Sequence, residues 1–239
     1  MKNLSILIAA SILINSCNVI NGTGVTGNGN IRTEKRITGN FNAVKTSGSI
    51  DIEINSGDAY AVSVENDDNI LQYVVTDIND GTLNVHYKDG YSIISDHAKV
   101  FVTAPSLDKL TVSGSGDITT QGMLKNSRQI EMNVSGSGNI KAEVDAPVIK
   151  ISVGGSGNIS LTGHTKDFTC GVSGSGDINC GGLESENATV KIAGSGNAHV
   201  FASVHLSATV AGSGDVYYRG NPPSPEIHTS GSGSVQAEK

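Results

Sequence analysis

The chain has 239 residues, 30 of them glycine and none tryptophan, and it carries 16 Lys or Arg against 23 Asp or Glu. This length predicts one domain or at most two small ones. The formal net charge of −7 argues against a nucleic-acid partner, which would need a clustered basic surface. With 37% apolar but only 4% aromatic residues, the core has to be aliphatic, which suits pleated strands. Composition therefore excludes a basic DNA-binding protein, a long helical bundle and a polytopic membrane protein.

The N-terminus resembles a bacterial lipoprotein signal. Lys2 precedes an apolar run over residues 4–14. This run is too short to span a membrane, which takes about twenty residues. Cys17 follows the small Ser16, and a thiol at this position is lipidated and becomes the first residue of the mature chain. We therefore predict a signal peptide over residues 1–16 and a membrane partner reached through a lipid anchor. The alternatives are ordinary cleavage nearby with a free thiol, or a buried cysteine in an uncleaved helix.

The predicted anchor places the protein in the cell envelope, as an outer-membrane lipoprotein whose surface or periplasmic orientation stays open. Residues 17–34 are rich in Gly, Asn and Thr and predict a flexible tether. Residues 35–239 then form the folded domain. Its N-terminal part, residues 35–109, is irregular, and residues 110–239 are regular.

A repeat dominates the regular part. The tripeptide Gly-Ser-Gly recurs at intervals of 22, 19, 19, 20, 18 and 19 residues. A period near 19 with glycine turns indicates a solenoid in which each repeat is one supersecondary unit. The seven corners begin at Gly114, Gly136, Gly155, Gly174, Gly194, Gly212 and Gly231.

Apolar residues occupy every second position on both sides of each corner, which is the period of a strand. This pattern predicts that each repeat consists of a strand, a Gly-Ser-Gly-Asp/Asn corner, a second strand and a looser return. We predict an all-β fold, a right-handed parallel β-helix with coils of about 19 residues, in which seven coils rise roughly 34 Å. The column two places before the corner holds Val112, Val134, Val153, Val172, Ile192, Val210 and Thr229, and the column four places after it holds Ile118, Ile140, Ile159, Ile178, Ala198, Val216 and Val235.

The corner residues suggest specific roles. Both glycines permit positive φ, and the Asp or Asn that follows tolerates the left-handed region. The stacked serines could form a ladder of hydroxyls. A calcium ladder is the alternative, but only three of the seven corner positions are acidic and the period is twice that of the calcium nonapeptide. We therefore predict structural turns and no metal site.

The irregular part predicts a different arrangement. Residues 46–52 look like one degenerate coil, with Val44, Ile50 and Ile52 in core columns. Asn79-Asp80-Gly81 is a hairpin-turn signal. We expect an antiparallel elaboration that caps the N-terminal edge of the solenoid. Its strands are predicted at residues 60–64, 71–75, 82–87 and 100–102.

These motifs resemble one known family. Residues 41–48, residues 105–116 and the serial Gly-Ser-Gly-Asp/Asn-Ile corners are similar to the putative auto-transporter adhesin, head GIN domain family of bacterial envelope lipoproteins. The resemblance covers about residues 35–239. It implies a β-helix and an adhesin-type role, and it brings no catalytic or ligand residue to this chain.

Cys170 and Cys180 lie ten residues apart, symmetrically about Ser175, in inward columns. A disulfide across one coil suits a protein outside the cytoplasm. The alternative is two buried thiols that fill core positions. Columns on different walls can lie too far apart to bridge, since the Cα atoms must approach within about 7 Å.

No reactive constellation emerges elsewhere, so we expect no catalytic residue and no cofactor. The six histidines show no ligand spacing, and no serine sits in a nucleophile elbow. The acidic run over residues 65–69 could bind a divalent cation, although a polar loop fits it better.

We therefore predict a non-enzymatic, lipid-anchored envelope protein that acts as an adhesin or surface-interaction scaffold, in contact with a glycan or another envelope protein. The alternatives are a glycan-active β-helix enzyme with converging acids near residues 60–104, and a periplasm-facing scaffold.

Overall fold

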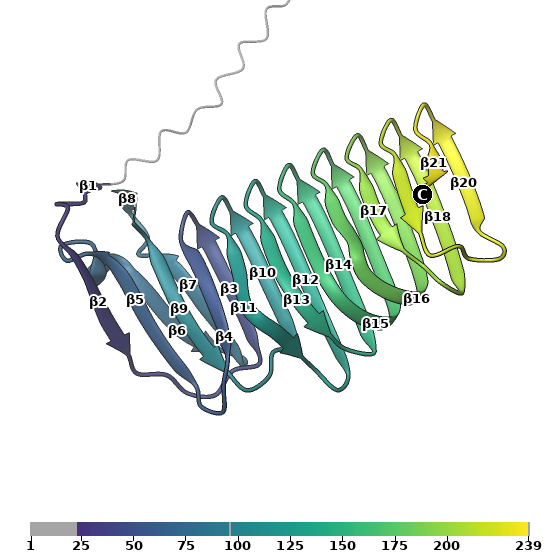
Figure 1. The fold of residues 1–239 in the computed structure, drawn as a ribbon. Coiled ribbons are helices and arrows are strands. Elements are labelled where there is room, and N and C mark those ends of the chain that lie inside the picture. Colours follow the sequence, from purple (N-terminus) through teal and green to yellow (C-terminus); the bar gives the residue numbers. More distant parts are fainter. Residues whose placement is uncertain (1–22, 96, 239) are drawn as a thin grey trace, which may run out of the picture.

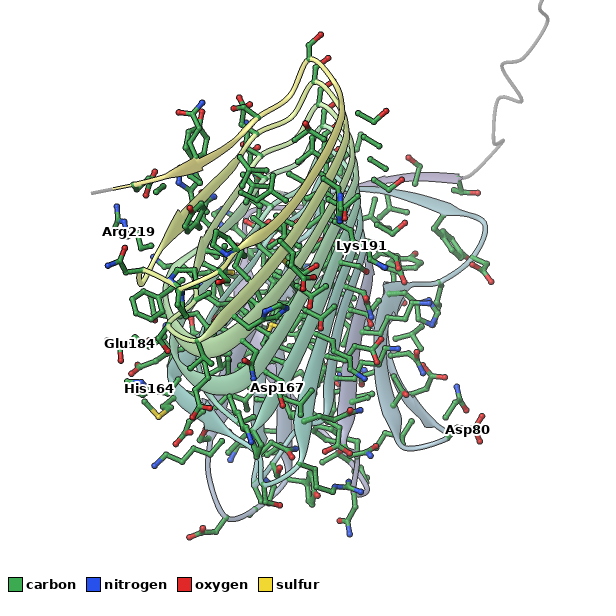
Figure 2. All side chains as sticks on the ribbon, turned by 90° about the vertical axis from the view of Figure 1, so that its right-hand side faces the viewer. Asp80, His164, Asp167, Glu184, Lys191 and Arg219 are labelled. Atoms are coloured by element: carbon green, nitrogen blue, oxygen red, sulfur yellow. The ribbon has the colours of Figure 1, made fainter. Side chains whose placement is uncertain are left out.

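The protein folds as a parallel β-solenoid (Figure 1). The computed structural model describes residues 23–95 and 97–238, and nothing in that part is a helix long and apolar enough to cross a membrane. Stacked strands form two walls joined at the Gly-Ser-Gly corners. Figure 2 looks along the stack and shows Lys191 and Arg219 projecting from opposite walls. The parallel β-helix expected from the repeat is confirmed, with an irregular N-terminal part.

The first wall contains the strands that end at a corner. Their pairing is parallel and in register, so that Gly114 lies opposite Gly136 and Gly48. An antiparallel strand, β6 (Val74–Asn79), closes the wall at its N-terminal end. In spatial order the parallel strands are β7 (Thr82–Tyr87), β3 (Ala43–Gly48), β10 (Lys109–Gly114), β12 (Gln129–Gly136), β14 (Val148–Gly155), the C-terminal halves of β15 (Ile159–Gly174) and β16 (Ile178–Gly194), β18 (His205–Gly212) and β20 (Glu226–Gly231).

The second wall contains the strands that leave a corner. Two antiparallel strands, β5 (Ala61–Asp67) and β2 (Ile31–Arg36), extend it at the N-terminal end. The parallel strands are β9 (Lys99–Ala104), β4 (Asp51–Ser56), β11 (Ile118–Lys125), β13 (Ile140–Asp145), the N-terminal halves of β15 and β16, β17 (Ala198–Phe201), β19 (Val216–Arg219) and β21 (Val235–Ala237).

The core lies between the walls and is almost entirely aliphatic. The predicted columns point inward, and Val112, Ile118 and Ile159 are fully buried. At the C-terminal end the columns open, since Thr229 is exposed and Val235 is only half-buried. The predicted looser return is a strand in the central coils, because β15 and β16 run without a break from one corner to the next.

The N-terminal part confirms the antiparallel elaboration and changes two details. Val44, Ile50 and Ile52 are buried, and β3 stacks on β10 as the expected extra coil. The turn at Asp80-Gly81 has positive φ at both residues, 49° and 74°. The strand expected at residues 71–75 begins instead as a 3-10 helix, η1 (Leu71–Tyr73), because the chain turns there from β5 on the second wall to β6 on the first.

The predicted tether also differs from the structure. Two stretches of that segment are paired: β1 (Thr23–Thr26) runs parallel to β8 (Tyr91–Ile94), and β2 runs antiparallel to β5. The segment is held by backbone ladders and not by an apolar face, so hydrophobic periodicity could not reveal it. Residues 1–22, which include Cys17 and the predicted signal peptide, lie outside the described residues.

Each corner is shaped by close contact between coils. The first glycine has φ between +121° and +144° in all seven corners. The second glycine does not have positive φ, but a Cβ atom at Gly157 would lie 2.0 Å from the carbonyl oxygen of Gly138. The approach of the preceding coil therefore requires a glycine at both positions, and the first glycine is required by its backbone conformation as well.

The Asp or Asn at the corner forms a hydrogen-bond ladder. The amide N–H of Asn158 donates to Oδ1 of Asn139 at 3.1 Å, and that of Asp177 donates to Oδ1 of Asn158 at 3.0 Å. The same bond recurs from Asp51 to Ser234. The side chain thus satisfies a backbone donor in the next coil, and left-handed backbone is not its role, since among the described non-glycine residues only Asp80 and Asn221 have positive φ.

We expect Gly155→Ala to destabilise the solenoid strongly. Its φ of +133° is unfavourable for alanine, and the new Cβ would lie 2.4 Å from the carbonyl oxygen of Gly136. The free energy of unfolding, measured by urea denaturation, should fall by about 2 kcal/mol or more. Ser156→Ala is the matched control, because that side chain is exposed and should change stability by less than about 0.5 kcal/mol. Equal stability of the two variants would contradict the close-contact explanation.

Candidate functional site

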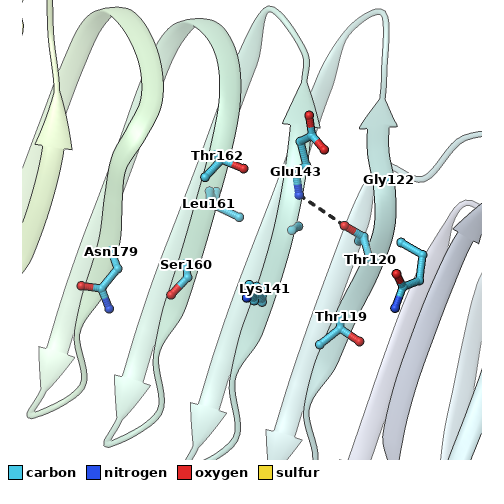
Figure 3. A pocket seen from close by; sticks show the side chains of 11 residues that line it. Thr119, Thr120, Gly122, Lys141, Glu143, Ser160, Leu161, Thr162 and Asn179 are labelled. Carbon is cyan, nitrogen blue, oxygen red and sulfur yellow. Dashed lines mark hydrogen bonds between the residues drawn. The ribbon is translucent and has the colours of Figure 1, made fainter.

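A hollow on the outer face of the second wall interrupts the regular repeat (Figure 3). The coil from Gly114 to Gly136 spans 22 residues, the longest interval. Opposite Ala142 of β13, β11 places three residues, 120–122, because its register shifts between Thr119 and Met123. β11 stays paired with β4 through Gln121 but loses its pairing with β13 at residues 120–122. The insertion therefore opens a space between the coils of β11 and β13.

The hollow has a volume of about 450 Å³, and most of the residues that line it have polar side chains. The hydroxyl of Thr120 accepts a hydrogen bond from the backbone N–H of Glu143 at 3.3 Å, which ties the bulge to β13. Gly122, with φ +80°, forms the turn of the bulge. Lys141 and Glu143 are exposed. The complete lining is Thr119, Thr120, Gln121, Gly122, Lys141, Ala142, Glu143, Ser160, Leu161, Thr162 and Asn179.

This arrangement can bind a polar ligand by hydrogen bonds. Hydroxyls, amides, one ammonium group and one carboxylate converge on a space open to solvent, and together they supply donors and acceptors in several directions. Lys141 forms no ion pair with the described residues, so its charge is available to a ligand. The lining has no cysteine, no histidine and only one acid, and therefore lacks a pair of acids for general acid–base chemistry.

The acidic run over residues 65–69 holds the N-terminal segment in place. The carboxylate of Asp67 accepts a hydrogen bond from the backbone N–H of Gly29 at 2.5 Å and from the hydroxyl of Ser95 at 2.8 Å. Asp68 accepts one from the side-chain amide of Asn28 at 2.6 Å. These acids are thus engaged by donors from the loop that joins β1 to β2. No group of three or more potential metal ligands occurs among the described residues.

Among the described acids of residues 60–104, Asp67 lacks the property expected of a glycosidase's general acid. The hydrogen bond from Ser95 is the main reason that the pKa of Asp67 is lowered, and the Gly29 amide adds to it. A general acid would need the opposite shift. The neighbouring hollow of about 350 Å³ is lined by Lys35, Arg36, Tyr60, Phe101 and five other residues without a carboxylate.

Cys170 and Cys180 are both free and fully buried in the core, at 1% and 0% exposure. They fill positions that other coils give to aliphatic residues, such as Ile151 and Leu161. Burial raises the pKa of both thiols, that of Cys180 to about 12. Neither thiol is a nucleophile in this environment.

Sequence reasoning missed the hollow. It also missed the clamp on the N-terminal segment, which is the set of hydrogen bonds that Asp67 and Asp68 accept from Gly29 and Asn28. The first repeat interval was three residues longer than the usual 19, and this excess was the available signal for the bulge. Nothing in the sequence indicated that Asn28 and Gly29 meet Asp67 and Asp68, because the contact joins residues about forty positions apart. The predicted corner glycines all occupy corners, where they have a structural role.

We expect the core thiols to react only after unfolding. In a Cys17→Ala chain at pH 8, Ellman's reagent should detect no thiol in the folded protein, because burial keeps both groups protonated and inaccessible. In guanidinium chloride without reductant it should detect Cys170 and Cys180 as two thiols. Detection of none after unfolding would show that the pair is oxidised to a disulfide.

Acid should release the N-terminal segment from its clamp. Because the pKa of Asp67 is lowered in the folded state, its stabilising contribution is complete above 3.8 and is lost as the pH falls below that value. Hydrogen exchange of the amides in β1 and β2, expressed relative to the intrinsic exchange rate at each pH, should therefore accelerate in acid. In Asp67→Ala it should already be fast at neutral pH, whereas Asp58→Ala, at an exposed site, should behave as wild type. Unchanged exchange in Asp67→Ala would exclude the clamp.

Comparison with known proteins identifies the family. The family described as putative auto-transporter adhesin, head GIN domain, matches residues 40–222. No curated protein matches the chain. Similar solved structures include a putative lipid binding protein from Parabacteroides distasonis, with 28% identity, 91% of this chain and 100% of that chain covered and a TM-score of 0.77. A putative adhesin from Parabacteroides merdae has 27% identity, with 91% and 100% covered and a TM-score of 0.73.

A putative adhesin from Bacteroides fragilis has a TM-score of 0.84 over 90% of this chain and 100% of that chain, and at 19% identity it supports the fold alone. The family match confirms the resemblance indicated by the serial corners. The chain therefore belongs to the putative auto-transporter adhesin, head GIN domain family.

Proposed function

We propose that this protein is a non-enzymatic, lipid-anchored adhesin of the cell envelope that binds a glycan at the hollow of the second wall. The anchor is Cys17, and the solenoid is a rigid support that holds the hollow away from the membrane. The observation that carries the proposal is the bulge of residues 120–122, which lengthens one coil of the repeat and opens a hollow lined mainly by polar residues.

The chemistry of the hollow favours a glycan. Sugars present many hydroxyl groups, and the side chains of Thr119, Lys141, Ser160 and Asn179 can pair with them as donors or acceptors. Because no aromatic ring lines the space, affinity would come from hydrogen bonds rather than stacking. The adhesin names of family and neighbours agree with a binding role. The lipid-binding name of one neighbour leads us to expect lipid contact at the anchor.

Removing the bulge tests the binding role. In a chain lacking Gln121 and Gly122, Thr120 would stand alone opposite Ala142, so that β11 could pair continuously with β13 and fill the hollow. Binding to glycan arrays and to glycan-coated beads should fall at least about tenfold, the loss expected from about 1.4 kcal/mol. Lys141→Ala should weaken binding by a similar factor, and Lys191→Ala, on the other wall, should have no effect.

Three results would oppose the proposal in different ways. Glycan binding that survives both changes at the hollow would place the contact elsewhere. Shortening of the glycan by the wild-type protein would favour the enzymatic alternative. Protease shaving of intact cells should remove an adhesin, and complete protection until lysis would favour a periplasmic scaffold.

A further inference from the structure

A small ribbon projects at the N-terminal end of the solenoid. Within the described residues, β1 and β8 pair with each other and with no strand of the large sheet. Tyr91 is 41% exposed and Ile94 is 61% exposed. Residues three apart on a strand point to opposite faces, so the ribbon presents an apolar side chain on each side. Most apolar residues in the described part of the chain are buried between the walls, and Tyr91 and Ile94 are two of the few large ones that are exposed and lie together on one strand.

The ribbon is held in a defined position. The Tyr91 ring packs on that of Tyr73, with 4.6 Å between centroids, and Nζ of Lys88 lies 6.0 Å from the Tyr73 ring. Backbone bonds close the ribbon at both ends, from Thr23 to Gly90 at 3.0 Å and from Gly27 to Ile94 at 2.9 Å. The clamp of Asp67 and Asp68 fixes the loop that follows. We call Tyr73, Lys88, Tyr91 and Ile94 the membrane foot.

The chain itself limits how far the membrane foot can lie from the predicted anchor. Tyr91 stands directly opposite Thr23 in the ribbon. Six residue steps separate Thr23 from Cys17, and an extended chain covers at most about 3.5 Å per step, or roughly 20 Å in all. If Cys17 carries lipid, the ribbon must stay near the bilayer surface.

We propose that the membrane foot inserts into the headgroup region of the bilayer that holds the lipid anchor. This inference rests on the anchor at Cys17 in the proposed function. Tyrosine combines an apolar ring with a polar end and is enriched at membrane interfaces, and a lysine beside it can reach lipid phosphates. A flat protein partner would cover only one face of the ribbon, whereas lipid headgroups can surround both faces. Asp89 offsets the charge of Lys88, so binding should depend on apolar burial and change little with salt.

Insertion would orient the whole solenoid. The membrane foot lies at the N-terminal end of the stack, and β20 and β21 lie at the other end (Figure 1). The coils would then stack outward from the bilayer, and the hollow on the second wall would stand clear of the lipid.

The absence of tryptophan allows a direct test. Tyr91→Trp keeps an aromatic ring against Tyr73, and Tyr217→Trp, in β19 near the C-terminal end, is the matched control. The full lipidated chain is reconstituted in phosphatidylcholine vesicles with brominated acyl chains, and acylation of Cys17 is checked by mass spectrometry. Circular dichroism verifies that both variants are folded. Relative to vesicles with unbrominated chains, the fluorescence intensity of Tyr91→Trp should fall roughly twofold. Its emission should also lie to the blue of that of an indole in water, since indoles sit at headgroup level.

The outcomes separate the membrane foot from the anchor. Quenching in Tyr91→Trp but not in Tyr217→Trp supports the proposal. An acylated chain in which both variants are quenched equally, or neither is, overturns the membrane foot and leaves the anchor intact. A chain without acyl groups on Cys17 overturns the anchor, and the membrane foot with it.

Discussion

The backbone contact at the Gly-Ser-Gly corner is the constraint on which the rest of the structure depends. The carbonyl oxygen of Gly136 accepts hydrogen bonds from the N–H groups of Ser156 and Gly157 at 2.9 and 3.0 Å, and the same pair recurs in each coil. This approach leaves no space for a Cβ atom at either glycine. These corner hydrogen bonds align each coil with the preceding one. They therefore fix the register of both walls, because one strand enters and one strand leaves every corner. With the register fixed, the similar aliphatic residues of each inward column stack directly on one another.

The repeat also explains where departures from regularity become informative. A coil that matches its neighbours needs only to satisfy the corner, the Asp or Asn ladder and the inward columns. The bulge of residues 120–122 satisfies none of these and places polar groups around an open space. A binding site on such a scaffold costs little in stability, since each coil contacts only its neighbours. The hollow and the N-terminal ribbon are two of the places where the chain departs from this repeat.

The N-terminal end of the solenoid is the part that the proposed anchor would hold at the membrane. Charged side chains along β2, such as Arg32, Glu34 and Lys35, discourage pairing with another chain at that edge of the sheet. Asp67 at the end of β5 and Asp68 directly after it then secure the segment that leads back toward Cys17. A rigid attachment at this point would transmit the orientation of the ribbon to the whole stack. The proposed anchor and membrane foot would therefore together set the orientation in which the solenoid presents the hollow.

The sequence by itself determined the parallel β-helix, the corner positions, the inward columns and the antiparallel N-terminal part. Each of these follows from a short period repeated many times, which a single chain displays directly. Tertiary structure alone decided the hollow, the pairing of residues 23–34 and the clamp of Asp67 on Gly29. It also gave the corner Asp and Asn their role as hydrogen-bond acceptors for the next coil. These features depend on backbone groups and on contacts between distant residues, and neither leaves a periodic pattern in the sequence.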